Sequence, residues 1–130
     1  MKEITSYDVG RFGEKACAKY LKKFKKFKIY GQNLTIGHLE ADIVAYDKEH
    51  IIIVEVKTRR EDKCNFNRPS SAVDESKRTN LIKFAYAFHK TLPPKLKNKA
   101  IRIDVCEITC IVNKKLRVCS LNYIENAISR

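Results

Sequence analysis

Three charged side chains at the ends of two apolar runs have types and a spacing that suggest chemistry. Asp42 opens the run Ala41–Ala45, and Glu55 and Lys57 close the next run, which starts at Ile51. Carboxylates and an ammonium group at the ends of buried strands cost free energy unless something pairs with them. A hard divalent cation prefers carboxylate oxygens, waters and substrate phosphates. The spacing therefore indicates a site where a metal ion and a phosphate backbone could meet.

These residue types suit the hydrolysis of a phosphodiester bond, which needs a Lewis acid and a group that orients the attacking water. Asp42 and Glu55 would bind the metal ion, and the backbone carbonyl of Val56 would be a third ligand if it points outward. Lys57 would hold the water. The alternative is an ordinary ion pair at a sheet edge, but both flanking runs look buried on both faces.

The two apolar runs must be neighbouring strands for these side chains to meet. We expect strands at 41–46 and 51–57 with a turn centred midway between them. Asp42 would then lie opposite Glu55, and Glu40 opposite Lys57. Because side chains alternate along a strand, Asp42, Glu55 and Lys57 would share one face of the sheet. A register offset by one residue would separate them.

An amphipathic helix is expected before these strands. Thr5–Asp8 fits a capping box, and apolar residues then recur at helical spacing as far as Phe24. Gly10 and Gly13 would let another element approach closely. Glu14 lies at the border of the apolar stripe, where it could be an outer metal ligand or an ordinary solvated acid. We interpret the lysines at the helix end as a solvated face; they are Lys22, Lys23, Lys25, Lys26 and Lys28.

The remaining elements follow from composition and spacing. We expect a strand at 28–34, a turn at Gly37, a long polar loop at 58–70 and a helix capped from Ser71 that ends at Pro93. Strands are expected at 101–108 and 117–121, and a short helix at 123–128. This α-β-β-β-α-β-β-α order predicts an α/β fold in one domain, 1–130, with helices covering a mixed sheet. The loop would contact phosphates through its basic residues Arg59, Arg60, Lys63 and Arg68.

Three further residues are candidates for supporting roles. Lys77 projects from the core-facing side of the second long helix, where a lysine can also extend its ammonium to solvent. Arg102 and Asp104 alternate with apolar residues and share one face of their strand. They could form a structural pair or help to contact substrate.

The composition narrows the class of protein. A formal net charge of +12 and a pI near 9.6 are typical of nucleic-acid-binding proteins. No apolar run approaches the roughly 20 residues of a membrane span, and the amino terminus has no signal-peptide core, so we expect a cytoplasmic protein without a membrane partner. Five cysteines without a C-x-x-C spacing predict reduced, mostly buried thiols rather than disulfides or a zinc site.

The ordered motifs resemble the YraN-like family of small bacterial predicted endonucleases, within the PD-(D/E)xK nuclease superfamily. The resemblance runs from about Gly10 to Ala127. Departures occur at Thr35, Leu39 and Asn67, where the family usually has arginine, glycine and glycine. The matching motifs are Gly13-Glu14, Ala18, Tyr20-Leu21, Asn33, Glu40–Ala45, Val54–Arg59, Phe66, Pro69, Ala72-Val73, Lys77, Arg102–Val105 and Asn126-Ala127.

The resemblance implies a restriction-endonuclease-like mixed sheet, similar to that of Holliday-junction resolvases, with magnesium or manganese as cofactor and DNA, branched DNA included, as substrate. It implies a catalytic cluster of Glu14, Asp42, Glu55 and Lys57, supported by Glu40, Lys77 and Arg102. A homodimer is a further expectation. Two alternatives stay open: a non-catalytic nucleic-acid-binding protein that keeps the nuclease fold, and a basic scaffold that docks on an acidic protein.

Overall fold

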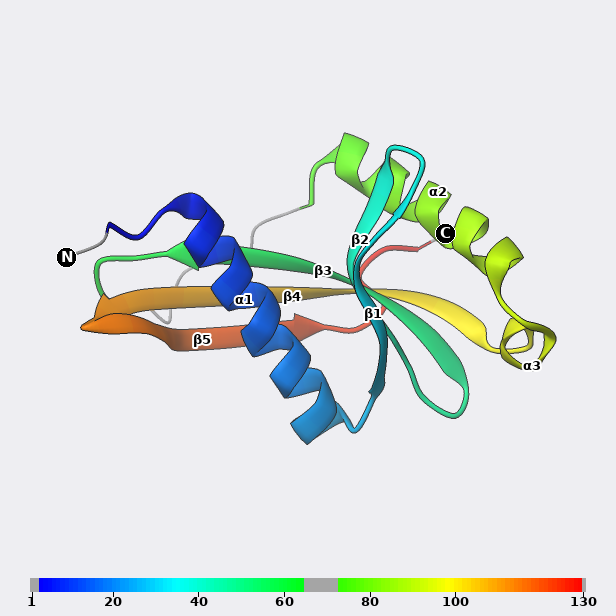
Figure 1. Ribbon diagram of the computed structural model, residues 1–130, viewed down its shortest axis with the longest axis horizontal. Helices are drawn as coiled ribbons and strands as arrows, with labels where there is room; N and C mark the ends of the chain where they lie inside the picture. Colours follow the sequence, from blue (N-terminus) through cyan, green and yellow to red (C-terminus); the bar gives the residue numbers. More distant parts are fainter. Residues whose placement is uncertain (1–2, 65–72, 130) are drawn as a thin grey trace.

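The strands of the described chain form one mixed β-sheet, and helices lie against it (Figure 1). The computed structural model describes residues 3–64 and 73–129. The strand order is β1-β2-β3-β4-β5, with β3 and β4 parallel and the other neighbouring pairs antiparallel. The elements are α1 (Ser6–Tyr20), η1 (Leu21–Lys25), β1 (Lys28–Ile36), β2 (Leu39–Tyr46), β3 (His50–Arg60), α2 (Glu75–Thr91), α3 (Pro94–Lys97), β4 (Ala100–Asn113) and β5 (Lys115–Ile124).

This arrangement confirms the expected α/β class with an open mixed sheet flanked by helices, and it is consistent with a restriction-endonuclease-like fold. A parallel pair of strands needs a crossover connection. The chain supplies it between β3 and β4 through α2 and α3. None of the helices in the two described stretches is long and apolar enough to cross a membrane.

Two hydrophobic cores lie on the two faces of the sheet. Ile51 and Ile53 of β3 pack in the cluster that contains Phe84 of α2. Ile52 and Val54, the alternate residues, pack in the cluster that contains Cys17, Ala18 and Leu21 of the first helical segment. Figure 1 shows α1 crossing β3, β4 and β5, while α2 lies beside β2. Burial on both faces explains why β3 reads as a continuous apolar run.

The expected start of α1 is confirmed. The Thr5 hydroxyl accepts a hydrogen bond from the Asp8 N–H, and the Asp8 carboxylate accepts one from the Thr5 N–H. Gly13 lies so close to β3 that a Cβ there would be 1.7 Å from the Thr58 Oγ1, which confirms its expected role in close packing. A Cβ added at Gly10 would meet nothing within 4 Å, so the expected close approach was wrong for Gly10.

The predicted hairpin register is also confirmed. The paired residues run from Tyr46 opposite Ile51 to Ile43 opposite Val54. The Asp47 carboxylate caps the turn by accepting hydrogen bonds from the N–H groups of Glu49 and His50. The described ladder ends at the Ile43–Val54 pair, one step before Asp42 and Glu55 would meet.

Two predicted boundaries next to the site were wrong. Strand β3 continues through Arg60 because its parallel pairing with β4 extends to Cys110, so Arg59 and Arg60 lie in a strand rather than in the polar loop. Helix α2 takes Asp74 as its N-cap, because the Asp74 carboxylate accepts from the Lys77 N–H. Residues 65–72, and with them Ser71 and Arg68, lie outside the described residues.

The predicted helix at 123–128 was wrong as well. Strand β5 runs to Ile124, which pairs with Val105 of β4. The chain then turns at Asn126, whose φ is 50°, and the Ala127 N–H donates to the Ile103 carbonyl. Pairing with β4 therefore replaces the local helical pattern.

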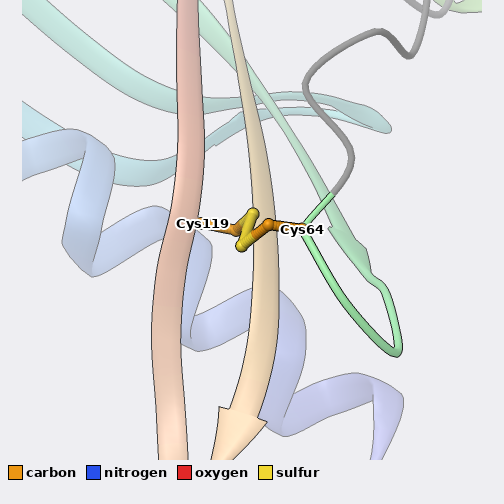
Figure 2. The surroundings of a disulfide bond; sticks show 2 residues. All are labelled: Cys64 and Cys119. Atoms are coloured by element: carbon orange, nitrogen blue, oxygen red, sulfur yellow. A yellow bond between two sulfur atoms is a disulfide. The ribbon is translucent and has the colours of Figure 1, made fainter.

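The expectation of reduced cysteines was wrong for one pair. Cys64, which follows β3, and Cys119 of β5 form a disulfide with a Cα–Cα distance of 5.7 Å (Figure 2). The sequence does not reveal this pairing, since 55 residues separate the two cysteines. Cys17, Cys106 and Cys110 are free and buried, as expected.

Candidate active site

A cleft with a volume of about 570 Å³ opens between the first turns of α1, the end of β3 and the start of α2. Because Gly13 allows α1 to touch β3 at Thr58, the helix is held close to the strand at this point. The residues that line the cleft are Ile4, Thr5, Ser6, Val9, Gly10, Glu14, Asp42, Val56, Thr58, Arg60 and Lys77. Its lining therefore combines two acids, Glu14 and Asp42, with two cations, Arg60 and Lys77.

Asp42 lies where β2 separates from β3. Its carboxylate Oδ2 accepts a hydrogen bond of 2.8 Å from the Val56 N–H, so the side chain replaces the next rung of the ladder. The N–H and carbonyl of one strand residue point to the same side of the strand. The Val56 carbonyl therefore points toward Asp42, outward from β4, as a third metal ligand would require.

Glu55 is the buried acid of the site. It is 4% exposed and lies on the α2 face of the sheet, where its Oε2 is 3.1 Å from the Lys77 Nζ. Burial and the adjacent Asp42 carboxylate raise the pKa of Glu55 to about 8, and Lys77 opposes this rise. Two carboxyl groups in contact repel when both are ionised. A second cation beside them would relieve that repulsion.

Lys77 is the lysine that the structure brings to this acid pair. Burial alone would lower the pKa of Lys77, but Glu55, Asp42 and Glu40 raise it, and the net shift is upward. Asp74 fixes the local backbone by capping α2. The sequence marked Lys77 only as a basic support, because an i−4 spacing to Leu81 does not show which strand the side chain will meet.

Lys57 lies two residues beyond Glu55 on β3 and pairs in register with Glu107 of β4. Like Glu55, it is not among the residues that line the cleft. The pKa of Asp74 is lowered by hydrogen bonds from the Lys77 N–H and Ser76 and then by the charges of Lys77 and Lys57. Lys57 thus lies near the start of α2, and its expected role toward water stays a prediction.

Glu14 reaches the site from α1, where it meets Asn33, a residue that the sequence marked only as a motif position. The Asn33 Nδ2 donates to the Glu14 Oε1 at 3.2 Å. Asn33 has a φ of 52°, and the β1–β2 register places it opposite Asp42. Asparagine tolerates this left-handed conformation better than most residues. Its place among the motifs of the resembling family was the available signal.

The other candidate residues lie in several places. Arg60 lines the cleft, whereas Arg59 and Lys63 do not. Arg102 instead donates two hydrogen bonds of 2.9 Å to Asp104, which is the structural pair considered above. Glu40 acts on Lys77 through its charge.

The acid pair is a sparse set of ligands for a metal ion. Within residues 3–64 and 73–129, no group of three or more His, Cys, Asp or Glu side chains is close enough to hold a metal. The acid pair, with the Val56 carbonyl directed toward it, offers fewer protein ligands than a closed metal cage. Mg²⁺ usually takes one or two carboxylates and completes its shell with waters and substrate phosphates. The residues present therefore fit a magnesium site that opens on a cleft.

The chain is similar to known proteins over nearly its whole length. The model of a family described as "Uncharacterised protein family UPF0102" matches residues 13–108, a stretch that includes Glu14, Asp42, Glu55 and Lys77. A UPF0102 protein of Caldanaerobacter subterraneus is 36% identical over 127 residues, covering 98% of this chain and 99% of the relative. One of Dictyoglomus thermophilum is 34% identical over 124 residues, with 95% and 99% coverage. One of Clostridium acetobutylicum is 36% identical over 120 residues, with 91% coverage of both.

Proposed function

The chain belongs to the UPF0102 family, and we propose that it is a magnesium-dependent endonuclease that hydrolyses phosphodiester bonds in DNA. The observation that carries this proposal is the contact of Glu55 with Asp42, a residue that lines the cleft. Two neighbouring acids and one lysine leave the group with a negative charge once Glu55 is ionised. Placing these charges together costs free energy in a partly buried position, so their grouping suggests a function.

The chemistry of the site divides among its own residues. Asp42, Glu55 and the Val56 carbonyl would hold Mg²⁺, with Mn²⁺ as a substitute, and the ion would supply a Lewis acid for the phosphoryl oxygen. Lys77, whose Nζ is already 3.1 Å from Glu55, would hold the attacking water or the developing negative charge. Asn33 would orient Glu14 through its hydrogen bond.

The substrate is proposed from charge and shape. The net charge of +12 favours a polyanion, and Arg60 and Lys77 present cations inside the cleft. A phosphate backbone between them would reach the acid pair. The cleft is open rather than a closed pocket, so a duplex, a fork and a four-way junction are all substrates to test. We include a homodimer in the proposal because a junction has two strands to cut.

A second candidate is a non-catalytic nucleic-acid-binding protein of the same fold. The ion pair between Lys77 and Glu55 favours it, because the ammonium already balances one carboxylate without a metal ion. In this case the cleft would bind phosphates through Arg60 and Lys77, and no bond would be cut. The two candidates differ in what magnesium does.

The test is cleavage of linear, forked and four-way DNA with and without magnesium. Wild-type protein should cut at least one of these only with magnesium, and Glu55→Gln should reduce cleavage by at least about 100-fold, since it removes a charge at the reacting centre. Glu49→Gln is the matched control, because Glu49 is an exposed acid in the β2–β3 turn. Binding without cleavage would leave the second candidate, and equal cleavage by wild type and Glu55→Gln would overturn the proposed site.

A further inference from the structure

A second candidate binding site lies at the other end of the first helical segment. We propose that Phe24 and its neighbours bind an unpaired base of single-stranded nucleic acid, with the ring stacking on the base and lysines contacting the phosphates. We call this surface the Phe24 platform; its residues are Tyr20, Lys22, Lys23, Phe24, Lys25, Lys26 and Tyr123. The proposal does not depend on catalysis at Asp42 and Glu55.

The charge of this segment is one-sided. Between Glu14 and Glu40 the sequence contains seven lysines and no acid. Glu125 reaches the platform and forms an ion pair with Lys25. The other lysines of the platform, Lys22, Lys23 and Lys26, are exposed to solvent. Clustered lysines that track a backbone are the electrostatic half of a single-strand site.

The aromatic half of the site is exposed yet held in place. Phe24 is 66% exposed, which is high for a phenylalanine. Its ring centroid lies 5.5 Å from that of Tyr20, which in turn lies 5.5 Å from that of Tyr123. The Tyr123 hydroxyl donates to the buried Asp104 at 2.6 Å. The outermost ring thus rests on two others, the last of which is anchored in the core.

The backbone explains why this ring points outward. Residues Leu21–Lys25 form a π-helical turn, a rare conformation that is frequent at functional sites. Leu21, at the start of the turn, and Phe27, just after it, are buried and fix the segment to the sheet. Lys26 then ends the turn with a φ of 61°. Phe24 is therefore presented by a rigid turn rather than by a loose end.

The surroundings favour nucleic acid over a membrane surface. An amphipathic helix that lies on a membrane needs a broad apolar face, but the apolar residues Cys17, Ala18 and Leu21 of this segment are buried in the core. What remains is one exposed ring between lysines, with the Lys23 Nζ 5.7 Å from its centroid. A single stacked ring with cations beside it suits a base and its phosphate.

The platform and the cleft lie along one helical segment. Gly10 lines the cleft, and the roughly 14 residues from it to Phe24 span roughly 20 Å at the helical rise. A stacked strand rises about 3.4 Å per nucleotide, so roughly six nucleotides would separate a base on Phe24 from a phosphate in the cleft. A strand shorter than this could occupy the platform but not both sites.

The absence of tryptophan from the sequence allows a direct test. Phe24→Trp places a single indole on the platform, and Tyr86→Trp places one at an exposed position of α2 as the matched control. Both would be made in the Glu55→Gln background with EDTA, so that cleavage cannot affect the result. A twelve-nucleotide single strand should quench the indole fluorescence of Phe24→Trp and leave that of Tyr86→Trp unchanged. The matching duplex should quench the fluorescence of Phe24→Trp much less.

Affinity gives a second measurement. Phe24→Ala should weaken binding of the single strand by roughly tenfold, and Phe24→Tyr should keep the wild-type affinity, because stacking on an aromatic ring tolerates that change. Equal affinity of Phe24→Ala and wild type would overturn the proposal. So would equal quenching of the Phe24→Trp indole by duplex and single strand, or a response of that indole only to vesicles of anionic lipid.

Discussion

Among the described residues, two buried carboxylates lie on neighbouring parallel strands, and the groups around them differ. Asp104 of β4 is fully buried and Glu55 of β3 is 4% exposed. In register, Asp104 lies beside Val54 and Glu55 lies beside Val105, so the two side chains are one residue apart along the strands and point to opposite faces. Their burial is alike, and their partners are not.

Asp104 has its charge compensated by donors. Arg102 donates to both of its oxygens, the Tyr123 hydroxyl donates to Oδ2 and the Asn126 N–H donates to Oδ1. Glu55 faces one lysine and one further acid, and its pKa is raised to about 8. The difference teaches that burial of an acid does not mark a reactive site. We propose a catalytic role for Glu55 because it also meets a second acid, Asp42.

The largest expected effect on stability comes from replacing Asp104, the acid that accepts hydrogen bonds from several donors. Asp104→Ala should lower the free energy of unfolding by about 3–5 kcal/mol, because Arg102 would lose its partner in a half-buried position. Glu55→Gln at pH 6 should change it by less than about 1 kcal/mol, since glutamine resembles the protonated acid. Urea unfolding of both variants measures the contrast. Equal destabilisation would remove the distinction between the two acids.

A smaller effect is expected from pH. The pKa of Glu55 is raised in the folded protein, so its contribution to stability is full below about pH 4.5 and is lost as pH rises through about 8. The difference in stability between wild type and Glu55→Gln should therefore shift toward the variant by about 1–3 kcal/mol between pH 5 and pH 9. Thermal unfolding in EDTA across this range checks it. A constant difference would contradict the raised pKa.

The next effect tests the close approach that forms the cleft. Gly13→Ala should destabilise the protein by about 1–2 kcal/mol, because the new methyl group would overlap Thr58. Gly10→Ala is the matched control and should stabilise α1 by up to about 1 kcal/mol, since nothing lies within 4 Å of its added Cβ. Denaturant unfolding measures both. Equal shifts in the same direction would show that α1 is not held against β3 at Gly13.

Local patterns were sufficient for much of the hairpin and of the first helix. Period-two alternation and one turn placed Ile43 opposite Val54, and capping chemistry placed the start of α1. Patterns failed where distant pairing decides the structure. Parallel pairing with β4 extends β3 to Arg60, and pairing of Ile124 with Val105 replaces the expected last helix.

The sequence could indicate that Asp42 and Glu55 are neighbours, but not that Lys77 meets Glu55. Asp42 and Glu55 follow from strand register, which a sequence can indicate. The meeting of Lys77 with Glu55 depends on how α2 crosses the sheet, and the contact of Asn33 with Glu14 depends on a left-handed residue within β1. No local period encodes either contact. The disulfide between Cys64 and Cys119 was missed for the same reason.

The central claim is that Asp42 and Glu55 together hold a divalent cation. Calorimetry of magnesium binding tests it most directly, at about pH 8.5, which is above the raised pKa of Glu55. Wild type and Glu49→Gln should bind Mg²⁺ or Mn²⁺ at one site, and Glu55→Gln should not. At about pH 7 the binding should also release about one proton, because Glu55 must ionise. Equal binding by wild type and Glu55→Gln, or no binding by wild type, would contradict it.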